Sequence, residues 1–380
     1  MSFRGACLFT ITLIGFMFVL VPAALVLAVD PFQIYHRTWF KQAGYGTIQN
    51  YQHAGWINTV LSNPDEQYDS IVIGSSTMAN YTQTLINEYL PWGKVMNLSL
   101  NGSTPIMQAA VARSALRHNP DIRHILWDIH FFYTYDADWD NSKPPDSFPY
   151  YLYDDSILND GKYFLNVTNV VTSIRFLLGN FNNFTFGIED NGPFYESLQA
   201  AGRFAAHGSR DYKLNTILPA IIDRNRVLPS NDILATYKYP SIDRNLLDII
   251  LPFCNTDKDI VLTFSPEDRS AYTQTTNDEH IFRQVNMRKY LVEKTSQCKN
   301  IRVFSFDDVD WIAAHPENYA DNFHYVIDVN HYIINSIAEN KHIMTMDNVD
   351  NFQKQFVDKI NNYKQLLLSS LEQPDTSQSR

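Results

Sequence analysis

The chain has 380 residues, which is enough for one large α/β domain or two smaller ones. Hydrophobic residues make up 45% of the sequence and aromatic residues 14%, which excludes an intrinsically disordered protein. The net charge is −11 and the sequence has no lysine- and arginine-rich run, so we expect no nucleic-acid partner.

The first predicted element is an apolar stretch without charges, residues 7–28, long enough to cross a hydrocarbon layer of ~30 Å. We predict a single-pass membrane anchor over residues 1–29. Arg4 before the stretch and Asp30 after it favour an N-terminus inside and the bulk of the chain outside. A cleaved signal peptide is the alternative, since Val26 and Ala28 suit a cleavage site, but the stretch exceeds the usual apolar region of about 7–15 residues.

The cysteines agree with export. Cys7 lies in the apolar stretch, so Cys254 and Cys298 are the only cysteines in the remainder of the sequence. They form either a disulfide or two buried free thiols, and their spacing matches no metal site. We predict neither a metal nor another cofactor.

Strand and helix signals alternate along much of the chain. Strand signals occur in five segments: 68–76, 93–100, 123–132, 258–266 and 300–308. Helices are predicted at 103–120, where Thr104 is a good N-cap and Pro105 suits the first position, and at 278–297. This alternation predicts an α/β fold, a three-layer α/β/α sandwich with a mostly parallel sheet.

One region departs from this alternation. Residues 134–235 are predicted to form an irregular insertion with loops and short helices. We therefore expect one α/β domain over about 30–345, interrupted by this insertion. An amphipathic helix at 346–371 and a flexible tail at 372–380 follow it.

The first strand ends in Gly74-Ser75-Ser76, at the edge of the sheet where such folds bind ligands. A reactive serine needs a base, a group that orients the base and donors for the oxyanion. Asp321 and His324 follow the last predicted strand of the sheet, and their spacing lets the carboxylate reach the imidazole in a loop or single turn. The alternative is that the serines only cap a helix.

Short motifs in a fixed order resemble the SGNH (GDSL-like) hydrolase superfamily. They are "AVDPFQIYH" (28–36), "IVIGSSTMAN" (71–80), "VMNLSLNGSTPIMQ" (95–108), "ILWDIHFFY" (125–133) and "DNFHY" (321–325). The match is closer to the membrane-anchored bacterial branch, which is similar to proteins of exopolysaccharide O-acetylation and teichoic-acid D-alanyl transfer. It covers about residues 29–135 and 255–340.

The resemblance implies the roles of single residues. Ser76 stands at the nucleophile position, Asp321 at the orienting acid and His324 at the base. The N–H groups of Ser76 and Gly102 would form the oxyanion hole, to which the Asn101 side chain could add a donor.

Two departures from the family pattern affect this site. Ser75 replaces the aspartate of Gly-Asp-Ser, and the Gly-x-Asn-Asp block, whose asparagine supplies an oxyanion donor, has no counterpart. Asp128 and His130 stand at the matching strand end. We predict that these two residues and Ser75 form the substrate rim.

Together these features predict an extracytoplasmic, serine-dependent acyl-ester transferase or esterase that acts on an envelope or secreted glycan. Its expected location is the bacterial inner membrane, with the α/β domain in the periplasm or at the cell surface. Expected partners are a glycan or acyl-ester substrate, the membrane and, as a candidate, a membrane-bound O-acyltransferase. The alternatives are a catalytically silent scaffold that binds glycan or the acyltransferase, which the missing asparagine block favours, and a lipid esterase.

Overall fold

The computed structural model describes residues 3–36, 49–129, 132, 147–178, 202–209, 228, 237–274 and 278–372. These residues belong to two compact units. The first is drawn from residues 1–67, 110–120 and 144–189, and the second from 68–109, 121–143 and 190–380. The predicted insertion at 134–235 lies in large part outside the described residues, and so does the predicted tail.

The second unit contains a six-stranded sheet in the order β2-β1-β3-β4-β5-β6 among the described residues. Its strands are β1 (Ser70–Ile73), β2 (Val95–Asn97), β3 (His124–Asp128), β4 (Asp259–Phe264), β5 (Ile301–Ser305) and β6 (Ile343–Met344). The first five are parallel, and β6 pairs antiparallel with β5 at the edge. The predicted α/β fold with a mostly parallel sheet is therefore confirmed. Because β2 and β3 flank β1, the strand order reverses there, and the carboxyl ends of β1 and β3 form a topological switch point.

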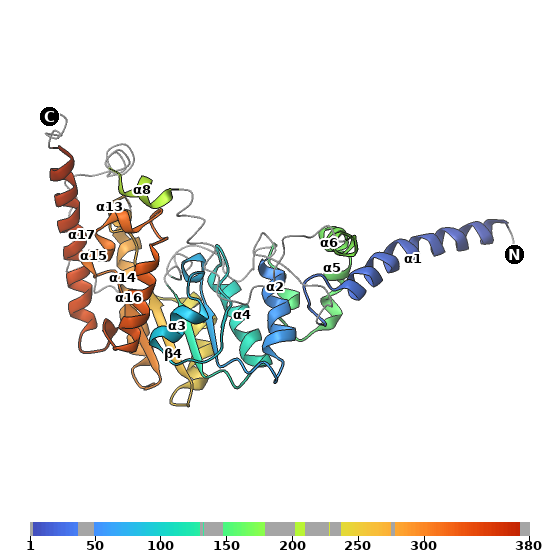
Figure 1. Cartoon of the computed structure of the whole chain (residues 1–380), viewed down its shortest axis with the longest axis horizontal. Helices are drawn as coiled ribbons and strands as arrows, with labels where there is room; N and C mark the ends of the chain where they lie inside the picture. The colour runs from blue at the N-terminus through green and yellow to red at the C-terminus, as the bar shows by residue number, and fades with distance from the viewer. Residues whose placement is uncertain are drawn as a thin grey trace. The chain divides into compact units, whose positions relative to one another are not determined.

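Helices cover both faces of this sheet (Figure 1). One face carries α3 (Gln83–Tyr89) and α16 (Ile327–Ala338), and the other carries α14 (Asp278–Thr295) and α17 (Val349–Glu372). The shorter helical segments of this unit are η2 (Ser76–Met78), α8 (Arg203–Gly208), α11 (Pro240–Ile242), η8 (Asp243–Leu247), α12 (Asp248–Ile250), η9 (Leu251–Phe253), α13 (Ser270–Gln274), α15 (Asp310–Ala313) and η10 (Pro316–Asn318). Helix α4 (Pro105–His118) has residues in both units.

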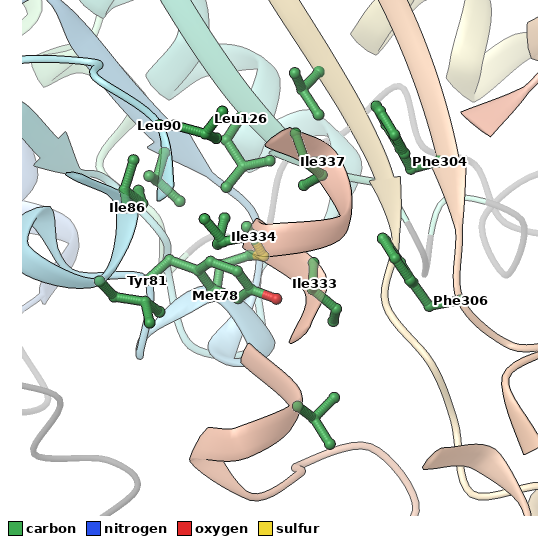
Figure 2. Packing of buried hydrophobic residues seen from close by; sticks show 14 of the residues in the cluster. Met78, Tyr81, Ile86, Leu90, Leu126, Phe304, Phe306, Ile333, Ile334 and Ile337 are labelled. Carbon is green, nitrogen blue, oxygen red and sulfur yellow. The ribbon is translucent and has the colours of Figure 1, made fainter. Parts of the chain in front are cut away.

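The core between the sheet and α16 fixes the elements that carry the candidate site. Figure 2 shows Ile333, Ile334 and Ile337 of α16 in one apolar cluster with Met78 and Leu126. All five side chains are at most 1% exposed. Burial of aliphatic side chains of this size stabilises a fold by about 1.5–3 kcal/mol each. Helix α16, which follows Asp321 and His324 in the chain, is thus packed onto the segment that follows β1.

The first unit is helical. It contains α1 (Phe3–Val29), α2 (Gln49–Gly55), the π-helix η1 (Trp56–Leu61), the 3₁₀ turns η4 (Tyr150–Leu152) and η5 (Ile157–Asn159), α5 (Gly161–Phe164) and α6 (Val167–Leu177). Asp30 follows α1 and is fully buried. Its carboxylate accepts hydrogen bonds from the amides of Ile34, Tyr35 and His36 and from the hydroxyl of Tyr163. This buried carboxylate fixes the turn by which the chain leaves α1.

Helix α1 covers the stretch predicted as a membrane anchor. No helix in the described part of the chain is long and apolar enough to cross a membrane, so the anchor is a prediction that the structure does not support.

The predicted helix at 103–120 is α4, which begins at Pro105. The helix that follows His324 is α16, which begins at Ile327. Val326 is its N-cap, without a side-chain bond, and Asp328 lies in the first turn. There its charge is favourable to the helix dipole.

Cys254 and Cys298 are joined by a disulfide, which decides between the two alternatives left by their spacing. The two residues are 44 positions apart in the chain, so the bond closes a long loop of the unfolded state. We expect its loss, in the Cys254→Ser/Cys298→Ser variant, to lower the free energy of unfolding by about 2–4 kcal/mol.

Denaturant unfolding with and without reductant measures this effect. The Cys7→Ser variant is the matched control, because it removes the cysteine outside the bridge. Equal midpoints with and without reductant, or full alkylation of both cysteines in the native protein, would contradict the prediction.

Candidate active site

Ser76, His324 and Asp321 form a hydrogen-bonded row. Ser76 Oγ lies 2.8 Å from His324 Nε2, and His324 Nδ1 lies 2.7 Å from Asp321 Oδ2. The serine lies in the turn after β1, whereas the other two residues lie in the loop before α16. His324 is 248 positions after Ser76 in the chain. The structure thus brings together the three residues that the sequence analysis named as nucleophile, base and orienting acid.

The loop that carries the acid and the base is closed by its own backbone. Ala320 N donates to His324 O at 2.7 Å, Val326 N donates to Asn318 O at 2.8 Å, and Tyr319 pairs with Tyr325 as an antiparallel bridge. The amide of Asp268, after β4, donates to Asn322 O at 2.9 Å and ties the loop to the sheet. These backbone bonds hold the two ends of the loop together and tie it to the segment after β4.

The two carboxylate oxygens of Asp321 accept hydrogen bonds from different groups. Oδ1 accepts from the amides of Phe323 and His324, each at 2.9 Å, and Oδ2 accepts from the imidazole. Burial opposes the carboxylate charge, but the hydrogen bond from His324, its electrostatic attraction and these two amides outweigh it and lower the pKa of Asp321 to about 2. An ionised carboxylate can only accept, so Nδ1 carries the ring proton. Nε2 is then the acceptor that faces the Ser76 hydroxyl.

The turn after β1 requires a glycine at its start. A Cβ atom on Gly74 would lie 2.5 Å from Met78 Cγ and 3.1 Å from Asp128 Cβ. Ser75 follows in extended conformation as the N-cap of η2, but its side chain makes no capping bond. The alternative that this hydroxyl caps a helix is thus not observed. Ser76 is half-buried at the end of the turn, with its hydroxyl on His324.

Gly102 lies in a second turn that is bonded to the same strand end. The Leu100 amide and the Ser103 hydroxyl both donate to Gly74 O at 3.0 Å, and Ser103 N closes the turn on Leu100 O. Gly102 has φ +63°, a left-handed conformation that other residues adopt at a cost. Within the described part of the chain, neither the Ser76 nor the Gly102 amide donates to another protein group, so both remain candidate oxyanion donors.

Asn101, the other predicted oxyanion donor, is exposed in this turn. A buried row of side chains supports the turn. Trp127 Nε1 donates to Gln108 Oε1 at 2.8 Å, and Gln108 Nε2 donates to Ser103 Oγ at 3.0 Å. The end of β3 therefore holds the Gly102 turn against the end of β1.

The predicted rim residues Ser75 and Asp128 are buried, at 4% and 2% exposed. Asp128 Oδ2 accepts from the Thr77 hydroxyl at 2.8 Å, which also lies 3.1 Å from Ser75 Oγ, and Oδ1 accepts from Ser265 N at 3.1 Å. Both residues thus lie beneath the serine turn, not on a surface that a substrate contacts. His130, the third predicted rim residue, lies outside the described residues.

This hydrogen-bonded group continues to the base loop. Ser265 Oγ lies 3.2 Å from the hydroxyl of Tyr325, which in turn lies 3.2 Å from that of Tyr81. Burial, together with the charge of Asp128, raises the pKa of Tyr325, so the phenol stays neutral and available as a donor. Thr77 follows Ser76 in the chain, and Tyr325 follows His324. The hydrogen-bonded group from Thr77 through Asp128 and Ser265 to Tyr325 therefore fixes the position of the nucleophile relative to the base.

Replacing Thr77 with valine tests the role of this hydrogen-bonded group, because valine lacks the hydroxyl but keeps the side-chain shape. The variant leaves a buried carboxylate oxygen without its donor, so we expect unfolding free energy to fall by about 1–3 kcal/mol. We expect kcat on an ester to fall by roughly 10- to 100-fold with little change in KM, since the serine turn shifts.

Thr77→Ser keeps the hydroxyl and should retain most of the activity. A loss in Thr77→Ser as large as in Thr77→Val would contradict a positioning role for this hydroxyl.

Sequence reasoning missed Thr77, Ser265 and Gln108. The usable signal was the position of Thr77 and Ser265 next to two strand ends, but their shared contact with Asp128 depends on which strands are neighbours.

Neither a scan against protein-family models nor a search of the curated proteins gave a match for this chain.

Proposed function

We propose that this protein is a serine-dependent acyl-ester transferase or esterase. The observation that carries the proposal is the row Ser76–His324–Asp321, with 2.8 Å and 2.7 Å between the bonded atoms. An ionised carboxylate, an imidazole that accepts at Nε2 and a hydroxyl aimed at that nitrogen are the arrangement that activates a serine.

The proposed reaction has two steps. His324 Nε2 takes the Ser76 proton while Ser76 Oγ bonds to the acyl carbonyl carbon, and the amides of Ser76 and Gly102 stabilise the oxyanion. The carbon–oxygen bond to the leaving alcohol then breaks, and His324 returns the proton to that alcohol. In the second step a sugar hydroxyl or water gives its proton to His324 and attacks the carbonyl carbon of the acyl-serine ester. The bond from that carbon to Ser76 Oγ then breaks, and His324 returns the proton to Ser76 Oγ.

The substrate class and the location are part of the proposal. The resemblance of five motifs to membrane-anchored SGNH proteins supports an envelope or secreted glycan as acceptor. The uncharged stretch 7–28 and the disulfide support an anchored position outside the cytoplasm. The competing hypothesis is a silent scaffold, which the missing Gly-x-Asn-Asp block favours.

Labelling of the full chain with a fluorophosphonate tests the reactive serine. We expect Ser76 to be modified, Ser76→Ala to stay unlabelled and Ser75→Ala to be labelled, because the Ser75 hydroxyl is bonded to Thr77 and has no base. Equal labelling of wild type and Ser76→Ala would favour the scaffold. Faster acetyl transfer to an added oligosaccharide than to water would assign transferase rather than esterase activity.

A further inference from the structure

Helix α6 exposes its apolar side chains. Val167, Val171, Ile174 and Leu177, with Leu178 just after the helix, are between 39% and 76% exposed. A helix on the surface of a protein in water normally turns such residues toward the core.

The polar side chains of α6 are buried instead. Asn169, Thr172 and Ser173 are at most 7% exposed. The Asn169 side chain donates to Tyr163 O at 2.8 Å, Ser173 Oγ donates to Asn169 O at 2.8 Å, and Thr172 Oγ1 donates to a carbonyl one turn earlier. The bond from Asn169 to Tyr163 O, outside the helix, would break if α6 rotated about its axis, whereas the bonds of Ser173 and Thr172 lie within α6 and satisfy their buried hydroxyls.

The exposed apolar surface extends beyond α6. Ile157 and Leu158 of η5 and Leu165 after α5 are at least 50% exposed. Helix α1 packs on α5 and α6 (Figure 1). Its exposed apolar residues include Phe18, at 78%, and Val21 and Leu27. We call these exposed side chains of α1, η5, α5 and α6 the apolar surface of the first unit. It is much larger than the isolated apolar residues that any protein surface shows.

Charge distinguishes this surface from the rest of the chain. Between residues 156 and 178 the only acid is Asp160, which is buried and accepts a hydrogen bond from the Tyr35 hydroxyl. The two basic residues in the segment, Lys162 and Arg175, are exposed. Asp155, just before it, is paired with Arg117 at 2.8 Å. Asp154, also exposed before the segment, accepts from Ser156 N and from the Asn159 side chain, each at 2.8 Å. Within residues 156–178 of this chain of net charge −11, the exposed charges are cations beside aliphatic side chains, which suits a layer of anionic headgroups over hydrocarbon.

We infer that the apolar surface of the first unit lies in the interfacial layer of a lipid bilayer, with α6 parallel to the membrane plane. The aliphatic side chains of α6 and η5 enter the acyl region, and Lys162 and Arg175 meet phosphate groups. The surface adjoins α1, whose own apolar residues face the same surroundings. This membrane contact is independent of the chemistry at Ser76.

Fluorescent labels at single cysteines test the inference in the full chain with Cys7→Ser. The protein is reconstituted in vesicles of phosphatidylcholine and phosphatidylglycerol, and a polarity-sensitive dye is attached to Val171→Cys, Leu177→Cys or Phe18→Cys. We expect blue-shifted emission at all three positions and quenching by lipids with brominated acyl chains. Leu366→Cys is the matched control, since Leu366 is a leucine on α17 that is 65% exposed, against 51% for Leu177, and its label should report water.

The labels separate the possible outcomes. Quenching at position 18 with water-like emission at 171 and 177 would overturn the inference and keep a membrane position for α1. If the emission at 171 and 177 is water-like in vesicles and shifts to the blue only when a membrane protein is added, the lipid contact is overturned and the surface binds a protein partner. Failure of the protein to join vesicles would also overturn it, whereas loss of fluorophosphonate labelling at Ser76 would not affect it.

Discussion

Replacing Ser76 with alanine, or His324 with alanine, is expected to lower kcat on a small acetyl ester by a factor on the order of 10⁴–10⁶. The alanine at 76 leaves no oxygen to attack the carbonyl. The alanine at 324 leaves the hydroxyl without the acceptor that now lies 2.8 Å away. Because the two residues act in one step, the double variant should be little slower than either single variant. Steady-state hydrolysis by the full chain measures all three rates.

Two controls separate lost chemistry from lost folding. Ser75→Ala removes a buried hydroxyl in the same turn, and His315→Ala removes an exposed histidine whose Nδ1 lies 2.8 Å from Glu317 Oε1. Both should keep most of the activity, and the thermal midpoints of Ser76→Ala and His324→Ala should stay within a few degrees of wild type. Full activity in Ser76→Ala would reject the enzyme and leave the scaffold.

The candidate site was predictable where its signals are local. A buried strand that ends in glycine and two serines predicts a sharp turn at the carboxyl edge of a sheet. Asp321 and His324 are three residues apart, so a tight loop brings them together in any fold. The pairing of the two segments follows from the parallel sheet, which brings the strand ends to one edge.

The rest depends on contacts between distant segments. The bond from Thr77 to Asp128 requires β1 and β3 to be neighbours, and no local pattern gives that order. Strand β2 ends at Asn97, before the end of its apolar pattern, and the Asn97 side chain donates to Met78 O and Tyr81 O. The amides of Leu98 and Leu100 still donate to the β1 segment, at Val72 O and Gly74 O. Arg288 on α14 is fully buried against Asp307 and the ring of Phe264, whereas helical periodicity places a charged residue outside.

Replacing Asp321 with asparagine is expected to lower kcat/KM by a factor on the order of 10⁴, with a smaller effect on folding. The asparagine oxygen can keep the bonds to the amides of Phe323 and His324, which hold the loop. Its NH₂ group would face Nδ1 as a donor and favour the tautomer with the proton on Nε2. That nitrogen could then no longer accept the Ser76 proton, and the imidazolium would lose its counter-charge.

The pH dependence of stability gives this variant a second readout. The pKa of Asp321 in the folded protein, about 2, is below its ordinary value of 3.8. Its charge therefore stabilises the fold above about pH 4, and this contribution disappears as the pH falls through about 2. Wild type should lose its advantage in unfolding free energy over Asp321→Asn across that interval.

Asp321→Ala completes the comparison, because it also removes the oxygen that accepts from the two loop amides. We expect it to unfold at a lower temperature than Asp321→Asn and to be no more active. If Asp321→Asn instead kept wild-type kcat/KM while Asp321→Ala lost it, the carboxylate would act only by holding the loop, and the charge and tautomer of His324 would not depend on it.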